Sequence, residues 1–182
     1  MGLPGSGKTT VGRQLARRLR IPFVDSDHVI EQRIGCAIRT FFEHQGEEAF
    51  RDIESQVIDE LSAHFQGVLS TGGGSVLRPI NREHLRTRGQ VFYLRATPEE
   101  VFRRLKHDRN RPLLQVDDPM KKLRDLYQVR DPLYRETAHY IIETARPSVS
   151  GLVNMITTQL ELSGELDAFR HDSSPATDSS AP

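Results

Sequence analysis

The sequence has no tryptophan, one cysteine (Cys36) and only four lysines among its 182 residues. A single cysteine excludes a disulfide framework and the usual cysteine-based zinc sites, and it favours a reducing, cytoplasmic location. The chain also lacks an apolar run of membrane-spanning length and anything that resembles a signal peptide. We therefore expect no membrane partner.

An excess of charge of either sign is missing too. Lys plus Arg and Asp plus Glu both number 25, so the formal net charge is zero and no broad field is available to gather nucleic acid. The basic residues include 21 arginines, the residue type that binds carboxylates and phosphates through two parallel hydrogen bonds. With 36% hydrophobic residues, the composition is that of one soluble globular domain, which we expect to be monomeric and to bind small anions locally.

Helical and strand-like patterns alternate along the chain, which predicts an α/β fold with a three-layer, doubly wound parallel sheet. The patterns place a domain at residues 1–162, a polar lid at 107–118 and a disordered tail at 163–182. Helices are expected over 9–20, 27–65 with breaks near Gly35 and Gly46, 82–88, 97–105, 119–137 and 148–162, and strands over 23–24, 67–71, 91–94 and 139–143.

A phosphate-binding motif opens at the second residue. The segment Gly2–Thr9 matches G-x-x-x-x-G-K-[ST] in full, and an amphipathic helix follows it. In such a loop the backbone N–H groups surround phosphate oxygens, Lys8 reaches the β- and γ-phosphates, and the Thr9 hydroxyl binds Mg²⁺. The motif predicts an ATP site with a magnesium cofactor but does not separate kinases from other nucleotide hydrolases.

Two further features follow predicted strands. Asp25 and Asp27 come after the first strand, and a run of three glycines, Gly72, Gly73 and Gly74, comes after the second. Ligands bind outside the carboxyl ends of parallel strands. We therefore expect both features on the acceptor side, the part of the site that binds the molecule receiving the phosphoryl group. On an extended segment, alternate carboxylates point opposite ways, so one can serve the metal while the other faces an acceptor hydroxyl. Taken alone, Asp-Ser-Asp is also typical of a helix N-cap, and a glycine run of a flexible turn.

The chain resembles the shikimate kinase family, small P-loop kinases related in fold to nucleoside monophosphate kinases. The matching segments cover residues 2 to 160 in the family's order: GLPGSGKTT, DSD, GEEAFRDIE, STGGGSV, RPLL and RDPLYRE. The resemblance implies ATP-dependent phosphorylation of the 3-hydroxyl of shikimate, a step towards chorismate and the aromatic amino acids. A gluconate kinase remains the alternative among enzymes, while a GTPase is disfavoured because the guanine-reading motif N-K-x-D is missing.

The resemblance also implies a role for each matching residue. Asp27 is the candidate base and binds the hydroxyls of shikimate. Arg51 and Arg130 bind the carboxylate of shikimate. Gly73 and its neighbours Gly72 and Gly74 contact the same substrate. Lys8 and Arg111 of the lid act on the transferred phosphoryl group, and Thr9, with Asp25 through water, holds Mg²⁺. The ATP site implied in this way comprises Gly5, Ser6, Gly7, Lys8, Thr9, Thr10, Arg111 and, at the adenine end, Arg146; Arg104 is a second candidate there.

One departure from the family pattern precedes the P-loop. Shikimate kinases have an apolar strand of about five residues there, whereas this sequence has Met1. Burying such a strand contributes on the order of 7–15 kcal/mol, as much as the net stability of a typical domain. The sequence therefore raises two hypotheses: that the natural protein carries about ten more residues before Met1, or that this chain is a catalytically impaired nucleotide-binding module.

Overall fold

Strands and helices alternate in the computed structural model, which describes residues 1–106 and 116–166. The order is α1 (Lys8–Leu19), β1 (Phe23–Asp25), α2 (Ser26–Ile34), α3 (Ile38–His64), β2 (Val68–Ser70), α4 (Pro79–Arg88), β3 (Phe92–Arg95), α5 (Pro98–Leu105), α6 (Pro119–Thr137), β4 (Tyr140–Glu143) and α7 (Val149–Leu162). The predicted α/β fold is confirmed, and the predicted breaks in the second helical stretch are real. Gly35 ends α2 with φ 70°, and Gly46 interrupts α3 with φ 82°.

The strands pair in parallel, in two pairs. β1 pairs with β2, with Phe23 opposite Val68, and β3 pairs with β4, with Phe92 opposite Tyr140. Within the described residues these remain two separate two-stranded sheets. Met1 lies between them, where its amine donates to the Phe92 carbonyl at 2.8 Å and its own carbonyl accepts from the Leu94 amide at 2.9 Å.

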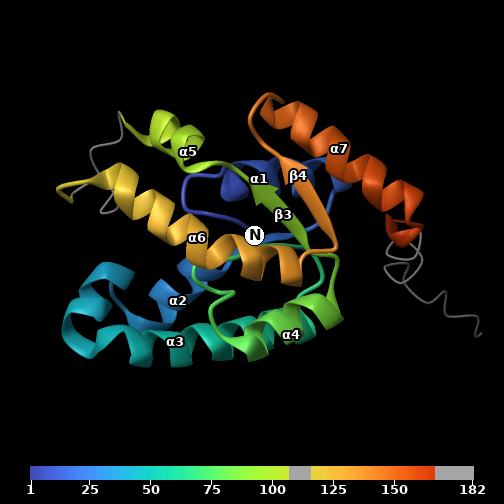
Figure 1. Ribbon diagram of the computed structural model, residues 1–182. Coiled ribbons are helices and arrows are strands. Elements are labelled where there is room, and N and C mark those ends of the chain that lie inside the picture. The colour runs from blue at the N-terminus through green and yellow to red at the C-terminus, as the bar shows by residue number, and fades with distance from the viewer. Residues whose placement is uncertain (107–115, 167–182) are drawn as a thin grey trace, which may run out of the picture.

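Helices cover both faces of these strands, which gives the predicted three layers (Figure 1). On one face, Val11 and Leu15 of α1 pack with Leu152 and Ile156 of α7 against Leu94. Two further apolar clusters lie on the other face. In one, Tyr93 of β3 packs with Tyr134 of α6. In the other, Ile58 of α3 and Leu85 of α4 pack with Val91. Among the residues that the structure describes, no helix is both long and apolar enough to cross a membrane.

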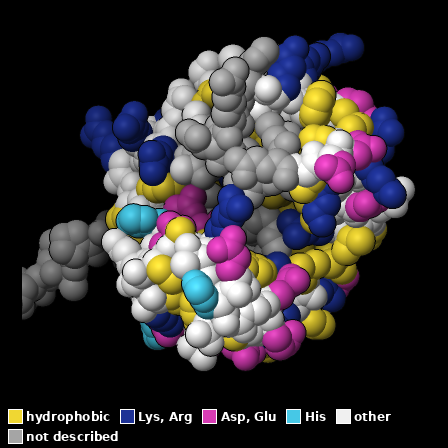
Figure 2. Space-filling model, turned by 90° about the vertical axis from the view of Figure 1, so that its left-hand side faces the viewer, with side chains coloured by type: hydrophobic (Ala, Val, Ile, Leu, Met, Phe, Trp, Pro, Cys, Tyr) yellow, Lys and Arg dark blue, Asp and Glu magenta, His cyan; other side chains and the backbone are white. Residues whose placement is uncertain are grey.

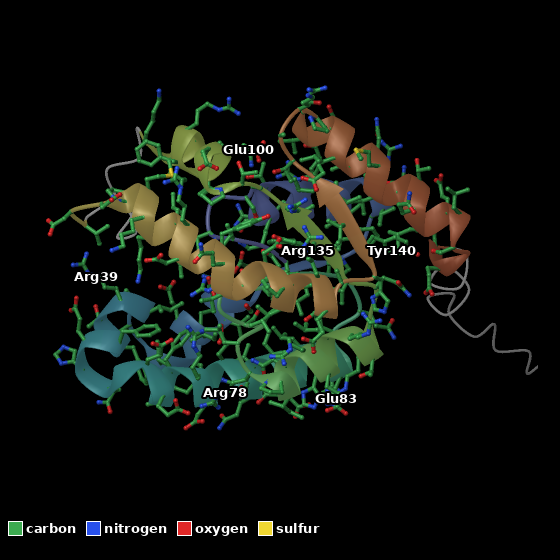
Figure 3. All side chains as sticks on the ribbon, viewed as in Figure 1. Arg39, Arg78, Glu83, Glu100, Arg135 and Tyr140 are labelled. Carbon is green, nitrogen blue, oxygen red and sulfur yellow. The ribbon has the colours of Figure 1, made fainter. Side chains whose placement is uncertain are left out.

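Local sequence explains several of the helix ends. Thr97 and Glu100 form a capping box at α5, because the Thr97 hydroxyl accepts from the Glu100 amide at 3.3 Å and the Glu100 carboxylate accepts from the Thr97 amide at 2.8 Å. The α4 helix begins at Pro79, three residues before the predicted start. Arg78, which precedes it, pairs with Glu48 and Asp52 of α3 and so ties the two helices together (Figure 3).

Candidate active site

The phosphate-binding loop has the backbone that its motif predicts. Gly7 is the N-cap of α1 with φ 98°, the left-handed region that favours glycine. The Lys8 ammonium donates to the Leu3 carbonyl at 2.9 Å, which holds it across the loop. Ser6 is buried beneath the loop, whereas Thr10 is exposed on α1. These residues present N–H donors and one cation to an anion at the start of a helix.

Thr9 and Asp25 meet beside this loop. The Thr9 hydroxyl donates to one carboxylate oxygen of Asp25 at 2.9 Å, and the other oxygen accepts from the Asp27 amide at 3.1 Å. Among the described residues, no three His, Cys, Asp or Glu side chains cluster as a metal site. Magnesium needs no such cluster, since it binds through one or two protein oxygens with substrate phosphates and water. The pair therefore fits Mg²⁺ held together with a nucleotide.

Asp27 lies at the edge of the acceptor side, in a different conformation from the one expected. It sits in the first turn of α2, and Asp25 acts as the helix N-cap, so the segment is not extended through both carboxylates. The Asp27 carboxylate packs against Gly72 so closely that a side chain there would collide with it. Burial, together with the neighbouring Asp25 carboxylate, raises the pKa of Asp27 to about 6.

The three-glycine turn is held firmly rather than flexible. The Gly72 amide donates to the Ser26 hydroxyl at 3.0 Å, and its carbonyl accepts from Ser75 at 2.8 Å. The buried Tyr134 hydroxyl donates to the carbonyl of Gly73. The turn thus has fixed backbone groups on the acceptor side of the site.

The turn also brings the other predicted residues together. A side chain at Gly73 would come within 2.9 Å of Pro4 in the phosphate-binding loop and 3.3 Å of the Arg130 guanidinium. At Gly74 it would collide with the guanidinium of Arg51. A side chain at either position would have to displace these groups, because arginines from two helices and the phosphate-binding loop converge on one turn.

Arg51 is buried, with 8% of its surface exposed, in a network of charges and aromatic rings. It donates to Glu54 at 2.6 Å and to Glu47 at 2.9 Å, and its guanidinium carbon lies 5.2 Å from the centre of the Phe50 ring. Glu54 is 1% exposed, and burial raises the pKa of its carboxyl although Arg51 opposes the shift. The Glu47 side chain is 62% exposed, so it is the more easily displaced partner of Arg51.

The adenine side is defined less completely. The Arg104 guanidinium donates to the Ser6 carbonyl at 3.3 Å and to the Thr144 hydroxyl at 3.2 Å, which joins α5 to the phosphate-binding loop and to the end of β4. Arg146 is exposed two residues beyond Thr144. Arg111 and most of the predicted lid lie outside the described residues. On the face shown in Figure 2, lysine and arginine side chains lie next to aspartate and glutamate side chains.

Sequence reasoning missed two residues of this site, Glu54 and Tyr134. Glu54 follows Arg51 by three positions on the same helix, a spacing that places the two side chains on one face and could have identified the pair. No comparable signal exists for Tyr134, because its contact with Gly73 joins residues 61 positions apart.

A lysine-bearing phosphate loop, a threonine–aspartate pair and an arginine-lined acceptor turn on a parallel α/β fold together define a P-loop kinase. The comparisons with known proteins name the family. The family model described as shikimate kinase matches residues 4–161. The chain is 57% identical over 164 residues to shikimate kinase of Ralstonia nicotianae, covering 90% of this chain and 86% of that protein. The chain belongs to the shikimate kinase family.

Other relatives and solved structures agree. Shikimate kinase of Cupriavidus pinatubonensis is 56% identical over 181 residues, covering 100% of this chain and 92% of that protein. The structure of shikimate kinase from Acinetobacter baumannii in complex with shikimate matches with a TM-score of 0.81 and 48% identity, over 91% of this chain and 92% of that chain. The Bacteroides thetaiotaomicron enzyme matches with a TM-score of 0.83 and 31% identity, over 88% and 96%.

Proposed function

We propose that the protein transfers the γ-phosphoryl group of ATP to the 3-hydroxyl of shikimate, giving shikimate 3-phosphate and ADP. The observation that carries this proposal is the convergence of Asp27, Arg51 and Arg130 on the glycine turn beside the phosphate-binding loop. A hydroxylated carboxylic acid is the kind of acceptor that such a set recognises, because guanidinium groups bind the carboxylate while a carboxylate receives the hydroxyl.

Each part of the site has a task in the transfer. Arg51 and Arg130 bind the acceptor's carboxylate, and backbone groups of Gly72–Gly74 hold its ring. The 3-hydroxyl oxygen forms a bond to the γ-phosphorus as the bond to ADP breaks, and the hydroxyl proton passes to Asp27. A pKa near 6 suits this role, since Asp27 is ionised at neutral pH yet more basic than an ordinary aspartate.

The phosphate side holds and neutralises ATP. Backbone N–H groups of Gly5–Thr10 surround the phosphates, and Lys8 balances the charge that develops on them. Thr9, with Asp25 through water, would hold Mg²⁺, which would supply further charge neutralisation. Arg111 completes this set from the lid, and Arg146 with Arg104 borders the adenine. We further propose that the protein acts as a cytoplasmic monomer.

The decisive experiment is an acceptor comparison with the purified 182-residue protein. ADP release with ATP and Mg²⁺ is expected to depend on shikimate and to stay at background with gluconate. Lys8→Met should abolish it, whereas Lys106→Met, at an exposed lysine that follows α5, should leave it unchanged. Turnover with gluconate alone, or nucleotide binding without turnover on either acid, would contradict the proposal.

A substitution of Glu47 tests the proposed carboxylate site, because we expect it to raise the affinity for shikimate rather than to lower it. Its carboxylate occupies two nitrogens of Arg51, Nε at 3.3 Å and Nη2 at 2.9 Å, which form one edge of the guanidinium. If the acceptor's carboxylate replaces Glu47 on this edge, Glu47→Gln removes a competitor. We expect the KM for shikimate to fall about threefold, as befits an exposed ion pair of less than 1 kcal/mol, with the KM for ATP unchanged. Glu43→Gln, one turn earlier, is the matched control.

A further inference from the structure

Tyr134 of α6 is buried behind the three-glycine turn, with 0% of its surface exposed. Its hydroxyl donates to the carbonyl of Gly73. The Arg130 guanidinium, one helical turn earlier, approaches the oxygen of the same hydroxyl, where it can act only as a donor. One hydroxyl therefore joins the glycine turn to an arginine of the proposed carboxylate site.

The surroundings of Tyr134 keep this hydroxyl protonated. Burial raises the pKa of Tyr134 well above its usual value, although the positive charge of Arg130 opposes the shift. A protonated tyrosine hydroxyl donates one hydrogen bond and can accept others through its oxygen. It can therefore serve the Gly73 carbonyl and the Arg130 guanidinium at the same time.

The helix that carries Arg130 gains an anchor from this hydroxyl. Pro132 lies inside α6, between Arg130 and Tyr134 in sequence, and it has no N–H to donate to the carbonyl of Gln128 four residues earlier. Because one main-chain hydrogen bond is missing from this turn of the helix, side-chain hydrogen bonds contribute more to its placement. The bond from Tyr134 to the glycine turn is such a contact.

A second buried tyrosine, Tyr93 of β3, packs against Tyr134 but has a different partner. The centres of the two rings lie 4.8 Å apart, and Tyr93 is also 0% exposed. The Tyr93 hydroxyl donates to Asp131 at 2.8 Å, and the other oxygen of that carboxylate accepts from Arg135 at 2.7 Å. Of these two packed tyrosines, only Tyr134 directs its hydroxyl to the glycine turn.

The contacts of Tyr134 are separate from those that hold the proposed base. Gly72, which packs against the Asp27 carboxylate, has hydrogen bonds with serine side chains that do not involve Tyr134. Gly73 lies on the other side, where a side chain would come within 3.3 Å of Arg130. Loss of the Tyr134 hydroxyl should therefore loosen Gly73 and Arg130 while Gly72 and Asp27 stay in place.

We propose that Tyr134 is a positioning residue for the acceptor, and that its hydroxyl holds the Arg130 guanidinium and the Gly73 carbonyl in a fixed relative position. The acceptor's carboxylate and ring then bind to one rigid unit. Because Tyr134 has no exposed surface, it acts through these two groups and does not touch the substrate. The inference rests on the proposed function, since it names a residue that organises the same acceptor site.

The test compares Tyr134→Phe with Tyr93→Phe. Each substitution removes one buried hydroxyl and keeps the ring, so both should lower the urea midpoint of unfolding to a similar extent. Only Tyr134→Phe should raise the KM for shikimate, by about tenfold, the equivalent of one hydrogen bond. Its kcat and its KM for ATP should stay within about twofold of normal. Assays at about 15 °C, near the temperature of maximum stability, keep a weakened variant folded.

A combination with Arg130→Ala shows whether Tyr134 acts through that arginine. In this background, Tyr134→Phe should raise the KM for shikimate by less than about threefold, because the guanidinium that it positions is already absent. A full tenfold rise in the double variant overturns the proposal. An equal rise in Tyr93→Phe also overturns it, since that result would show a purely structural effect.

The unmodified protein separates this inference from the proposed function. If it releases no ADP in response to shikimate, the proposed function fails and the role of Tyr134 fails with it. If it phosphorylates shikimate and Tyr134→Phe has an unchanged KM for shikimate, only the role of Tyr134 is overturned.

Discussion

Asp27→Asn is expected to lower kcat by about 10²- to 10⁴-fold, the range typical of losing a general base, while making the folded protein more stable at neutral pH. Asparagine keeps the size of the side chain and its fit against Gly72. It cannot accept the hydroxyl proton, however, so turnover falls although both substrates still bind. Steady-state kinetics of ADP release measures the loss.

The stability gain follows from the raised pKa. The folded protein binds the Asp27 proton more tightly than the unfolded chain does, because burial raises the folded-state pKa to about 6. The stability that this proton contributes is complete below about pH 4 and is lost as the pH rises through 6. Above pH 7 the buried charge costs up to about 3 kcal/mol, which asparagine removes. Asp27→Asn should therefore raise the urea midpoint of unfolding more at pH 8 than at pH 5.

The pH profile of the unmodified enzyme supplies an independent check. Because the reaction needs Asp27 ionised, kcat/KM should decline as the pH falls through about 6. Asp125→Asn, at an exposed carboxylate on α6, is the matched control and should change neither turnover nor stability. An Asp27→Asn enzyme with more than a tenth of normal turnover would show that this carboxylate is not the base.

Sequence pattern predicted the fold well because its main determinants are local. The spacing of Val11, Leu15 and Leu19 identifies α1, and glycine identifies the breaks at Gly35 and Gly46, where φ is positive. The phosphate-binding loop was predicted for the same reason, since its motif is contiguous. The start of α4 was missed by three residues, as Pro79 at the first helical position was not taken as a start.

The acceptor side could not be derived in this way. Nothing in the helical pattern distinguishes Arg51 from an exposed arginine, and only the family resemblance selected it together with Arg130. The burial of Glu54, the hydrogen bond from Tyr134 to the glycine turn and the raised pKa of Asp27 depend on segments that are distant in sequence. Local sequence patterns cannot predict such contacts, because burial and charge coupling arise only after the chain has folded.

Arg51→Ala is expected to damage both folding and substrate binding. Removing the guanidinium leaves Glu54 buried without its partner at 2.6 Å, which costs about 3–5 kcal/mol of stability. It also removes half of the proposed carboxylate site, so the KM for shikimate should rise about 100-fold, the equivalent of one strong charged hydrogen-bond pair. The KM for ATP should stay within twofold. Urea unfolding and steady-state kinetics measure the two effects separately.

A second substitution separates the structural role of Arg51 from its binding role. Adding Glu54→Gln to Arg51→Ala removes the uncompensated buried charge, so stability should recover by about 2 kcal/mol or more while the KM for shikimate stays high. Arg130→Ala is the matched control, because Arg130 is only half-buried: it should raise the same KM with a stability loss of about 1 kcal/mol. If the double variant regained a normal KM, Arg51 would serve only to neutralise Glu54, and the acceptor's carboxylate would have to bind elsewhere.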